Sequence, residues 1–408
     1  MLQAVVSYRS VPRILGILND RNVLGLNWIP HFTSVINWTL LVGLGLLNQV
    51  KAISSPWLAI VDHTIDIGTK KALVVLRVKL DTLSNKGSAI QLADCECIGL
   101  KLCETVNGET IAADLREIFK QAGNPKAIIS DCDASLQKGI RLWSDQQEQT
   151  IPAIADIGHV MANALKQEFE KTESYQRFIQ LSTQGGHRLR QTEWAFLIPP
   201  KLRSKGRFQS ISNIGQWAEN MLGVLAVKGG AKKGSLLAKL RQAMPGFLSL
   251  QPFIRRFAST TQIVAQVMSI VKNKGLDENS YKACYQLSET LPKKSKVKKR
   301  LQHWLEKHIA IQKQITTLPL LVSSDIIESL FGNFKHIMAR SPQADMNRAA
   351  LLIPTLCGNQ DHATIMQALT QVRHKDLAQW EQENVPYTIR RKRRAFFANL
   401  KSQKTGNG

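Results

Sequence analysis

The chain has 408 residues, 44% of them hydrophobic, and carries 54 Lys and Arg against 31 Asp and Glu, a formal net charge of +23. The hydrophobic content excludes a disordered protein, and the length predicts two or three domains with at least one filled core. A positive excess of this size favours a polyanionic partner, most commonly nucleic acid, over a merely basic soluble protein.

The first fifty residues predict two short amphipathic helices joined by a turn. Such a pair suits the remnant of a helix-turn-helix that binds DNA, and it suits equally a helical cap on the next domain. No signal peptide is expected, because charged residues and a proline interrupt the first twenty-one positions. The apolar stretch 36–50 is too short for a membrane span and predicts a core helix. The six cysteines include no CxxC pair, so we expect reduced thiols and a cytoplasmic protein without a membrane partner.

Residues 51–165 change to a pattern of strands and βα units. Three strands are expected first, at 57–62, 71–80 and 93–102, with a turn at 66–70 between the first two. The segments that follow alternate between helix and strand: a helix at 110–123 that Gly123 ends, a strand at 127–131, a helix at 134–146, a strand at 151–156 and a helix from about His159. The order β-β-β-α-β-α-β-α predicts an α/β, ribonuclease H-like mixed five-stranded sheet.

The rest of the chain predicts helices. Residues 166–320 form a large all-α insertion, 321–345 contain the last helix of the sheet domain, and 346–408 form a helical region with a basic tail. A basic run within the insertion is either the solvated end of a helix or a surface that contacts the DNA backbone, and the overall charge favours the second. Its residues are Lys293, Lys294, Lys298, Lys299 and Arg300.

Two aspartates end apolar strands of the predicted sheet. Asp62 follows the first strand and Asp131 follows the fourth, and these two strands lie side by side in a sheet of this type. Each alone is best explained as a cap on the next turn. Together they place two like charges close to one another, and a divalent cation is the usual reason for such an arrangement.

A third acid is expected from outside the sheet. Glu328 begins a helix after an apolar run, although Asp325 and Glu328 also match a capping box, which is a purely structural role. Lys335 lies seven residues after Glu328, on the same helical face, from which its ammonium group can reach a phosphate.

These residues resemble the motifs of the DDE transposases, which share the ribonuclease H-like fold of retroviral integrases. The resemblance rests on Asp62 in WLAIVDHTIDIG, Asp131 in AIISDCDAS, and Glu328 in SSDIIESLFGNFK with Lys335 beyond it. The segment ADIGH, with Asp156 and His159, resembles the D-x-x-H signature of hAT and Mutator-like transposases. Those groups carry a large helical insertion where this chain has residues 165 to 320.

The resemblance implies a chemistry and its partners. Two Mg²⁺ or Mn²⁺ ions would be held by Asp62, Asp131 and Glu328, the catalytic carboxylates, for hydrolysis of DNA at transposon ends and strand transfer into target DNA. Lys335 and Arg340 would contact DNA. The protein would act as a homodimer or larger assembly of a mobile element such as an insertion sequence, and would associate with the nucleoid.

Several alternatives stay open. Asp66 or Asp133 could replace a neighbouring ligand, and His63 is treated as an ordinary strand-end residue. Asp156 and His159 lie beside the site or the end DNA, or else cap a helix and satisfy a carbonyl.

The three insertion tryptophans can stack on a flipped base, but burial in a helical core is the more common role for Trp194, Trp217 and Trp304. For the whole chain, the alternatives are a nuclease or resolvase that only cleaves, and a non-catalytic DNA-binding protein derived from a transposase.

Overall fold

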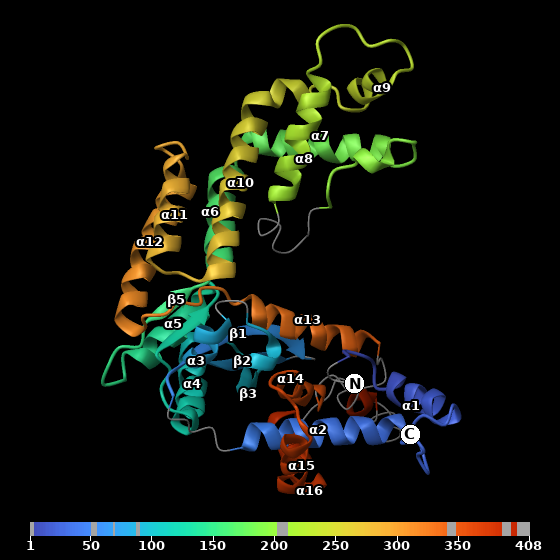
Figure 1. Cartoon of the computed structure of the whole chain (residues 1–408), viewed down its shortest axis with the longest axis vertical. Helices are drawn as coiled ribbons and strands as arrows, with labels where there is room; N and C mark the ends of the chain where they lie inside the picture. Colours follow the sequence, from blue (N-terminus) through green and yellow to red (C-terminus); the bar gives the residue numbers. More distant parts are fainter. Residues whose placement is uncertain are drawn as a thin grey trace, which may run out of the picture. The chain divides into compact units, whose positions relative to one another are not determined.

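The computed structural model describes residues 4–49, 55–67, 70–86, 90–201, 211–340, 348–385 and 393–397, with the side chains of 64–67 and 84–86 excepted. The chain forms two compact units (Figure 1). Unit 1 comprises Met1–Ile154 and Ser323–Gly408, and unit 2 comprises Ala155–Val322. The division of the sequence into functional domains stays a prediction.

Unit 1 is built on one mixed sheet of five strands. The strands are β1 Trp57–Ile67, β2 Lys70–Lys79, β3 Glu96–Cys103, β4 Ala127–Ser130 and β5 Ala153–Ala155. Their spatial order is β3-β2-β1-β4-β5, in which β1, β2 and β3 pair antiparallel and β4 runs parallel to β1. This is the ribonuclease H-like strand order, so the predicted fold class is confirmed.

The antiparallel hairpin is longer than the sequence predicted. β1 continues to Ile67, which pairs with Lys70 at the start of β2, so the turn expected at 66–70 is wrong for Asp66, Ile67 and Lys70. The alternation of apolar Ile65 and Ile67 with polar neighbours is a strand pattern, and it outweighs the turn tendency of Asp66 and the following Gly. β3 in turn starts later than predicted, because a 3-10 helix, η1 Leu92–Asp94, occupies the first positions.

One face of the sheet is covered by α4 Gly108–Ala122 and α5 Ala134–Ser144. Side chains of these helices pack with Ala59, Val61 and Ile128 in one core cluster. The approach is close at Gly99 of β3, where a Cβ atom would stand 2.5 Å from Ile118 of α4. Glycine at this position therefore allows the helix to reach the sheet.

The opposite face and the β3 edge carry helices from both ends of the chain. They are α2 Phe32–Asn48, α13 Asp325–Ala339 and α14 Leu352–Thr355; α13 contacts β1, whereas α2 and α14 contact β3 (Figure 1). α2 also packs on α15 His362–Gln371 and is buried from Leu40 to Leu46. A Cβ on Gly43 would stand 1.9 Å from the carbonyl oxygen of Leu351, so only glycine permits this crossing. A helix buried in this way favours the cap over the helix-turn-helix interpretation of residues 1–50.

The remaining elements of unit 1 are short. They are α1 Ser10–Asp20, α3 Leu80–Lys86, η4 Arg348–Leu351 and α16 His374–Asn384. Throughout the part of the chain that the structure describes, no helix combines the length and apolar character needed to cross a membrane.

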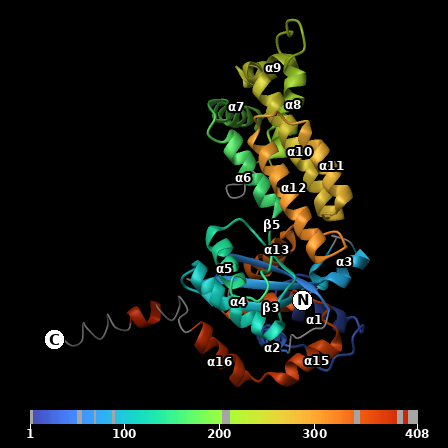
Figure 2. The ribbon, with the colours of Figure 1, turned by 90° about the vertical axis from the view of Figure 1, so that its left-hand side faces the viewer.

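Unit 2 is a helical assembly, as the pattern of residues 166–320 predicted. Its helices are α6 Ile157–Phe169, α7 Glu173–Leu189, α8 Ser212–Leu225, α9 Leu236–Ala243, α10 Gln251–Lys274, α11 Glu278–Glu289 and α12 Lys296–Ile315, with 3-10 helices η2 Ala195–Leu197 and η3 Phe247–Leu250 (Figure 2). Aromatic rings hold α6, α7 and α10 together, with Phe257 in contact with Phe169, Tyr175 and Phe178.

A buried carboxylate joins three helices of unit 2. Glu168 of α6 accepts hydrogen bonds from Arg256 of α10 (2.7 Å), from the Ser295 hydroxyl (2.7 Å) and from the Val297 N–H (2.9 Å). Ser295 is also the N-cap of α12. Burial alone would raise the pKa of Glu168, but these donors outweigh it and the pKa is lowered.

Candidate functional site

The sequence placed Asp62 at the end of a strand, but pairing with β2 carries β1 on to Ile67, so Asp62 lies inside the strand; it is buried, at 5% exposure. Because Ala59 and Val61 face α4 and α5, the alternation of the strand directs Asp62 to the opposite face, where α13 packs. Its Oδ1 accepts a hydrogen bond from the His63 N–H (2.6 Å). The backbone therefore fixes the orientation of this carboxylate.

Asp131 stands beside Asp62. The last pair of the parallel ladder joins Val61 to Ser130, so Asp62 and Asp131 occupy the next position on each chain. Neighbouring strands lie about 4.8 Å apart, and Ile128 faces α4 and α5 as Val61 does. β1 and β4 are thus neighbours, as the sequence predicted, and the convergence of the two carboxylates on one site stays a prediction.

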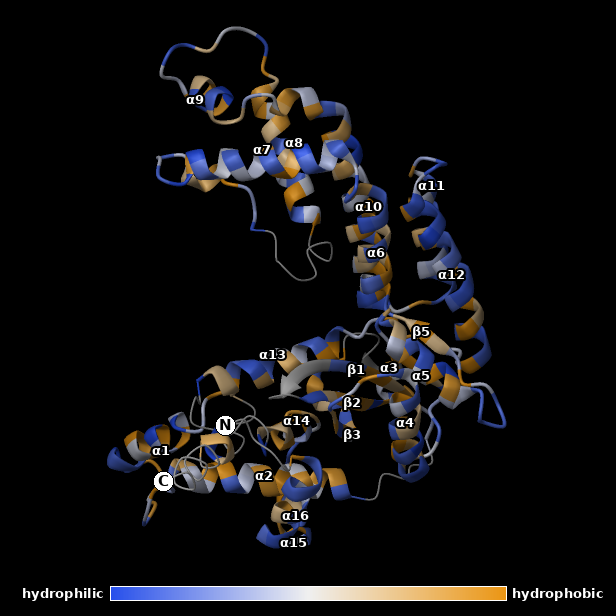
Figure 3. Ribbon diagram, turned by 180° about the vertical axis from the view of Figure 1, so that it is seen from behind, coloured by the Kyte–Doolittle hydropathy of each residue, from blue (hydrophilic) through white to orange (hydrophobic). Residues whose placement is uncertain are grey.

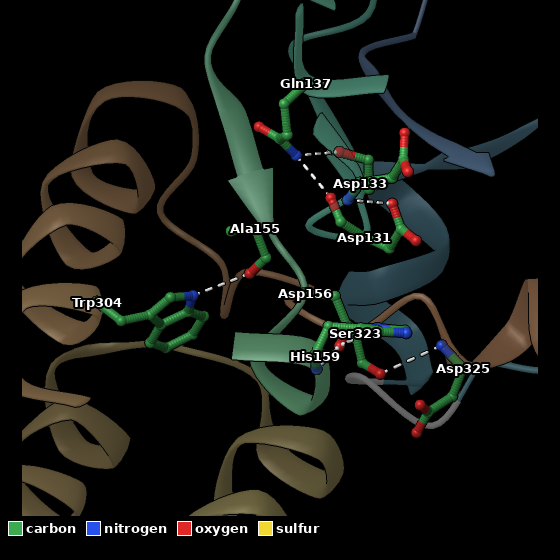
Figure 4. Close-up of polar contacts among 10 residues, drawn as sticks. Asp131, Asp133, Gln137, Ala155, Asp156, His159, Trp304, Ser323 and Asp325 are labelled. Atoms are coloured by element: carbon green, nitrogen blue, oxygen red, sulfur yellow. Dashed lines mark hydrogen bonds and ion pairs between the residues drawn. The ribbon is translucent and has the colours of Figure 1, made fainter. Parts of the chain in front are cut away.

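The turn after β4 is held by residues that the sequence analysis did not select. Gln137 of α5 donates through Nε2 to the Ser130 hydroxyl (2.9 Å) and to the Asp131 carbonyl oxygen (2.6 Å), as Figure 4 shows. The Asp131 carboxylate accepts from the Asp133 N–H (2.9 Å). The sequence signal was available: an amide side chain one turn into a helix can reach back to the strand that precedes it.

Asp133 has a structural task. Its Oδ1 accepts hydrogen bonds from the N–H groups of Ser135 and Leu136, both at 3.0 Å, so it is the N-cap of α5. This contact accounts for Asp133 without a ligand role. The other alternative ligand, Asp66, has a side chain outside the described residues.

His63 is the residue whose surroundings were least expected. Neither ring nitrogen has a hydrogen-bond partner among the described residues. Burial lowers its pKa to about 4, while the Asp133 carboxylate acts in the raising direction and Lys71 in the lowering direction. The imidazole is therefore neutral at pH 7.

Glu328 lies on α13, which packs on β1. The N-cap of that helix is Ser324, and it makes no side-chain capping bond. Since Asp325 is already the first helical residue, the pair Asp325 and Glu328 does not form the capping box considered as an alternative. Glu328 is exposed, beside a buried stripe that includes Ile327 and Leu330.

Lys335 and Arg340 follow along the same helix. Both are exposed, and Lys335 is two turns beyond Glu328 on the same flank. Their exposure is compatible with phosphate contact, and the assignment to DNA stays a prediction.

A site for two divalent cations requires several oxygen ligands close together. Asp62 and Asp131 offer hard oxygen ligands at neighbouring positions, which suits Mg²⁺ or Mn²⁺. Within the described ranges, however, no group of three or more His, Cys, Asp or Glu side chains has an arrangement that could hold a metal ion. The structure thus brings two of the three predicted ligands to neighbouring positions and does not form a metal-holding group with Glu328.

Asp156 and His159 belong to unit 2. Asp156 caps α6 by accepting from the His159 N–H (2.8 Å), and its Oδ1 lies 3.2 Å from Nδ1 of the His159 ring. Of the two roles that the sequence left open for Asp156, the structure shows the helix cap. The residue before it, Ala155, is held at both backbone groups. The indole N–H of Trp304 donates to its carbonyl oxygen (2.9 Å), as Figure 4 shows, and its own N–H donates to Nε2 of His308 (3.1 Å).

The three tryptophans of the insertion make contacts within unit 2. Trp304 is buried, and the indole N–H of Trp217 donates to the Leu197 carbonyl oxygen (2.9 Å). Trp194 is half-buried beside Phe196. These contacts favour the core role over base stacking.

The basic run divides into two kinds of residue. Lys293, Lys294, Lys299 and Arg300 are exposed, and Figure 3 shows α11 and α12 as largely hydrophilic. Lys298 differs, because its side chain is only 12% exposed and its ammonium group lies 2.9 Å from Glu289. Lys298 is therefore a weaker candidate for contact with the DNA backbone than the four exposed residues of the run.

Comparisons with known proteins add little to this geometry. No protein-family model matches the chain, and no curated protein matches it. A solved structure described as the "Drosophila P element transposase strand transfer complex" superposes with a TM-score of 0.45 and 11% identity, over 86% of this chain and 90% of that one. A similarity at this level carries no conclusion about function, and the fold assignment rests on the strand order.

Proposed function

We propose that the chain is a metal-dependent DNA transposase of the DDE type. The observation that supports this most is where the parallel ladder of β1 and β4 stops: Asp62 and Asp131 occupy the next position on each chain, and β1 contacts the helix that carries Glu328. The net charge of +23 supports a polyanionic substrate.

In this proposal Asp62 and Asp131 hold Mg²⁺ or Mn²⁺, and Glu328 completes the ligand set. When bound, such ions activate a water molecule and stabilise the charge that develops on the leaving oxygen. The proposal requires the Glu328 carboxylate to approach the two aspartates in the cation-loaded, DNA-bound protein, because they do not form a ligand group within the described ranges.

The protein's own groups would position the reactants. The His63 N–H orients the Asp62 carboxylate, and Gln137 fixes the backbone at Asp131. Lys335 would contact a DNA phosphate beside the site through its ammonium group. Arg340 would do so through its planar guanidinium group. Hydrolysis would free a 3′-hydroxyl, and a second in-line displacement would join it to target DNA without a covalent protein intermediate.

Two element ends must be cut and joined in one event, so the active form is proposed to be a homodimer or larger assembly on DNA.

A nuclease that cleaves DNA but does not join it differs from a transposase only in the second step. A non-catalytic DNA-binding protein is favoured by one specific observation: no three-carboxylate metal group is present among the described side chains.

The test uses DNA that contains the sequences flanking the coding region. The full chain is incubated with it and target plasmid in Mg²⁺ or Mn²⁺, and cleaved and joined products are separated. We expect both products from the wild type and neither from Asp62→Ala, Asp131→Ala or Glu328→Ala. Cleavage without joining supports the nuclease, whereas DNA binding without either product supports the non-catalytic protein. Equal activity in the variants contradicts the site.

A further inference from the structure

α1 is a helix with little burial in its own chain. The structure describes all of α1, and no residue of it is buried, whereas the adjoining α2 is buried from Leu40 to Leu46. The side chains of Ile14 and Ile17 are 46% and 50% exposed. A surface helix of a globular protein normally turns its apolar side chains toward the core. The two isoleucines therefore leave an apolar part of α1 uncovered by its own chain.

The loop after α1 is also apolar, and it has a defined conformation. The Asn19 amide donates to the Leu26 carbonyl oxygen (3.1 Å) and accepts from the Leu26 N–H (2.6 Å). The Val23 N–H donates to the Leu18 carbonyl oxygen (3.0 Å). Residues 22–28 are nonetheless all exposed, and none is charged. Its large exposed apolar side chains are Val23, Leu24, Leu26 and Trp28. A loop without a cation offers nothing to phosphates, so a protein partner fits it better than DNA.

The exposed apolar area is sufficient for a homodimer. The two isoleucines of α1 and the four side chains of the loop are between 39% and 65% exposed. At roughly 200 Å² for a fully exposed residue of this size, they present about 600 Å² in total. A standard interface buries about 800 Å² on each partner, roughly 60% of it apolar. Residues 14–28 therefore supply the apolar area of one half of such an interface.

The exposed side of α1 is complementary to itself. At 3.6 residues per turn, Arg13, Gly16, Ile17 and Asp20 lie along one side of the helix. If two antiparallel copies of α1 cross between residues 16 and 17, Arg13 of each copy faces Asp20 of the other. The same two-fold axis places Ile17 of each copy over Gly16 of the other. A second copy of the chain thus matches this surface in charge and in shape.

The monomer does not account for these residues. A Cβ atom on Gly16 would have no atom within 4 Å, and glycine is unfavourable inside a helix, so the fold of one chain does not require it. Arg13 and Asp20 are exposed and have no ion-pair partner among the described residues. They also oppose the helix macrodipole, which favours acids in the first turn and bases in the last. A close crossing with two intermolecular ion pairs explains all three positions.

We propose that α1 pairs with α1 of a second copy of this chain in an antiparallel, two-fold symmetric contact, with the loop 22–28 beside it. The contact contains two Arg13–Asp20 ion pairs, and Ile17 of each copy packs on Gly16 of the other. A lipid surface is a poorer match, because interfacial helices are rich in Lys and Arg and α1 has a single Arg. The inference rests on the proposed function for the need of two copies on DNA, but its test measures association without DNA.

Sedimentation equilibrium of the full chain without DNA measures this association. A buffer with about 0.15 M NaCl largely screens charges more than about 8 Å apart, which limits the repulsion between two basic chains. We expect a monomer–dimer equilibrium for the wild type. Ile17→Asp should raise the dimer dissociation constant at least about a hundredfold, and Gly16→Leu at least about tenfold. Because leucine favours a helix more than glycine does, the second result would not come from a weakened α1.

Reversal of charge tests the antiparallel pairing. Arg13→Asp places an acid opposite an acid and Asp20→Arg a base opposite a base, so each should raise the dissociation constant at least about tenfold. Each change suits the helix macrodipole, so loss of helix would not explain the effect. The double variant, which exchanges the two residues, should associate within about threefold of the wild type. Asp145→Arg, an exposed change elsewhere in unit 1, is the control, and circular dichroism melting verifies folding.

The proposal is wrong if the wild type is monomeric up to about 100 µM, if Ile17→Asp associates like the wild type, or if the double variant does not recover. A monomer that binds phosphatidylglycerol vesicles, and loses this binding in Ile17→Asp, would assign α1 to a lipid surface instead. Dimers that do not cleave DNA would contradict the proposed function and support this inference, whereas cleavage by a chain that does not associate through α1 would do the reverse.

Discussion

Two buried carboxylates differ in what surrounds them. Glu168 in unit 2 receives a guanidinium, a hydroxyl and a backbone N–H from two other helices, so it joins helices together. Asp62 in unit 1 instead lies where the parallel pairing of β1 with β4 stops, beside the position of a second acid, Asp131. A carboxylate surrounded by donors stabilises a fold, whereas two carboxylates placed side by side are best explained by a ligand that neutralises them.

The largest expected effect is the loss of DNA cleavage when the Asp62 carboxylate is removed. Asp62→Asn should lower the rate of DNA cleavage at least about a thousandfold if the proposed function holds. The free energy of unfolding should be unchanged or higher, because a like charge beside Asp131 has been removed. Cleavage kinetics and urea denaturation measure these quantities, with Asp145→Asn, an exposed acid of unit 1, as control. A strongly destabilised Asp62→Asn would assign Asp62 a structural role like that of Glu168.

The next effect concerns pH in unit 2. Burial lowers the pKa of His308 to about 4, against the effect of the Trp304 carbonyl, which accepts from Nδ1. Between about pH 4 and pH 6.5, His308 therefore binds a proton in the unfolded chain but not in the folded chain. Stability is complete above pH 6.5 and falls toward pH 4, by up to about 3 kcal/mol for this group.

Replacement of His308 by Gln isolates this contribution, since His63 has a pKa lowered in the same direction. Thermal unfolding between pH 4 and 7 should depend less on pH in His308→Gln than in the wild type. Identical pH profiles would show that His308 does not carry the dependence.

A third change weakens the structural carboxylate. Glu168→Gln should reduce the free energy of unfolding by about 2 kcal/mol, because the donors from α10 and α12 lose their charged acceptor. The lowered pKa of Glu168 sets the direction with pH: its stabilisation is present above the ordinary glutamate pKa and is lost as pH falls through the lower folded value. The wild type should approach the variant in strongly acidic solution, which denaturation at pH 7 and pH 3 can test.

A smaller effect tests the support of Asp131. Gln137→Leu removes the donor to Ser130 and to the Asp131 carbonyl oxygen, so cleavage should slow about tenfold while the melting temperature changes little. The Mg²⁺ concentration for half-maximal rate should rise in the same variant. A lower rate with an unchanged Mg²⁺ requirement would mean that Gln137 does not act through Asp131.

The smallest effect compares neighbouring lysines. Lys299→Ala removes an exposed charge and should weaken DNA binding a few-fold, with a salt slope about 0.9 smaller. Lys298→Ala should leave the slope unchanged, because its ammonium group is already paired with Glu289. Fluorescence anisotropy over a salt series distinguishes them, and equal slopes for the two variants would remove the distinction.

Much of unit 1 was predictable because its signals are local. Apolar strands, Gly123 after α4 and the order of elements predicted the sheet class, and Asp131 follows the end of a strand as expected, whereas Asp62 lies inside one. The length of β1 was not predictable in the same way, because pairing with β2 extended it past a turn signal.

The sequence by itself determined the class of sheet and the neighbouring strands to which Asp62 and Asp131 belong, because strand periodicity and the order of elements are local features of the chain. Only the tertiary structure decided which acids share an environment. It showed that Glu168 has donors from helices 88 and 129 residues away, that Gln137 supports Asp131, and that Glu328 is not part of a capping box. Contacts between distant segments depend on packing, and packing leaves no periodic signal in the chain.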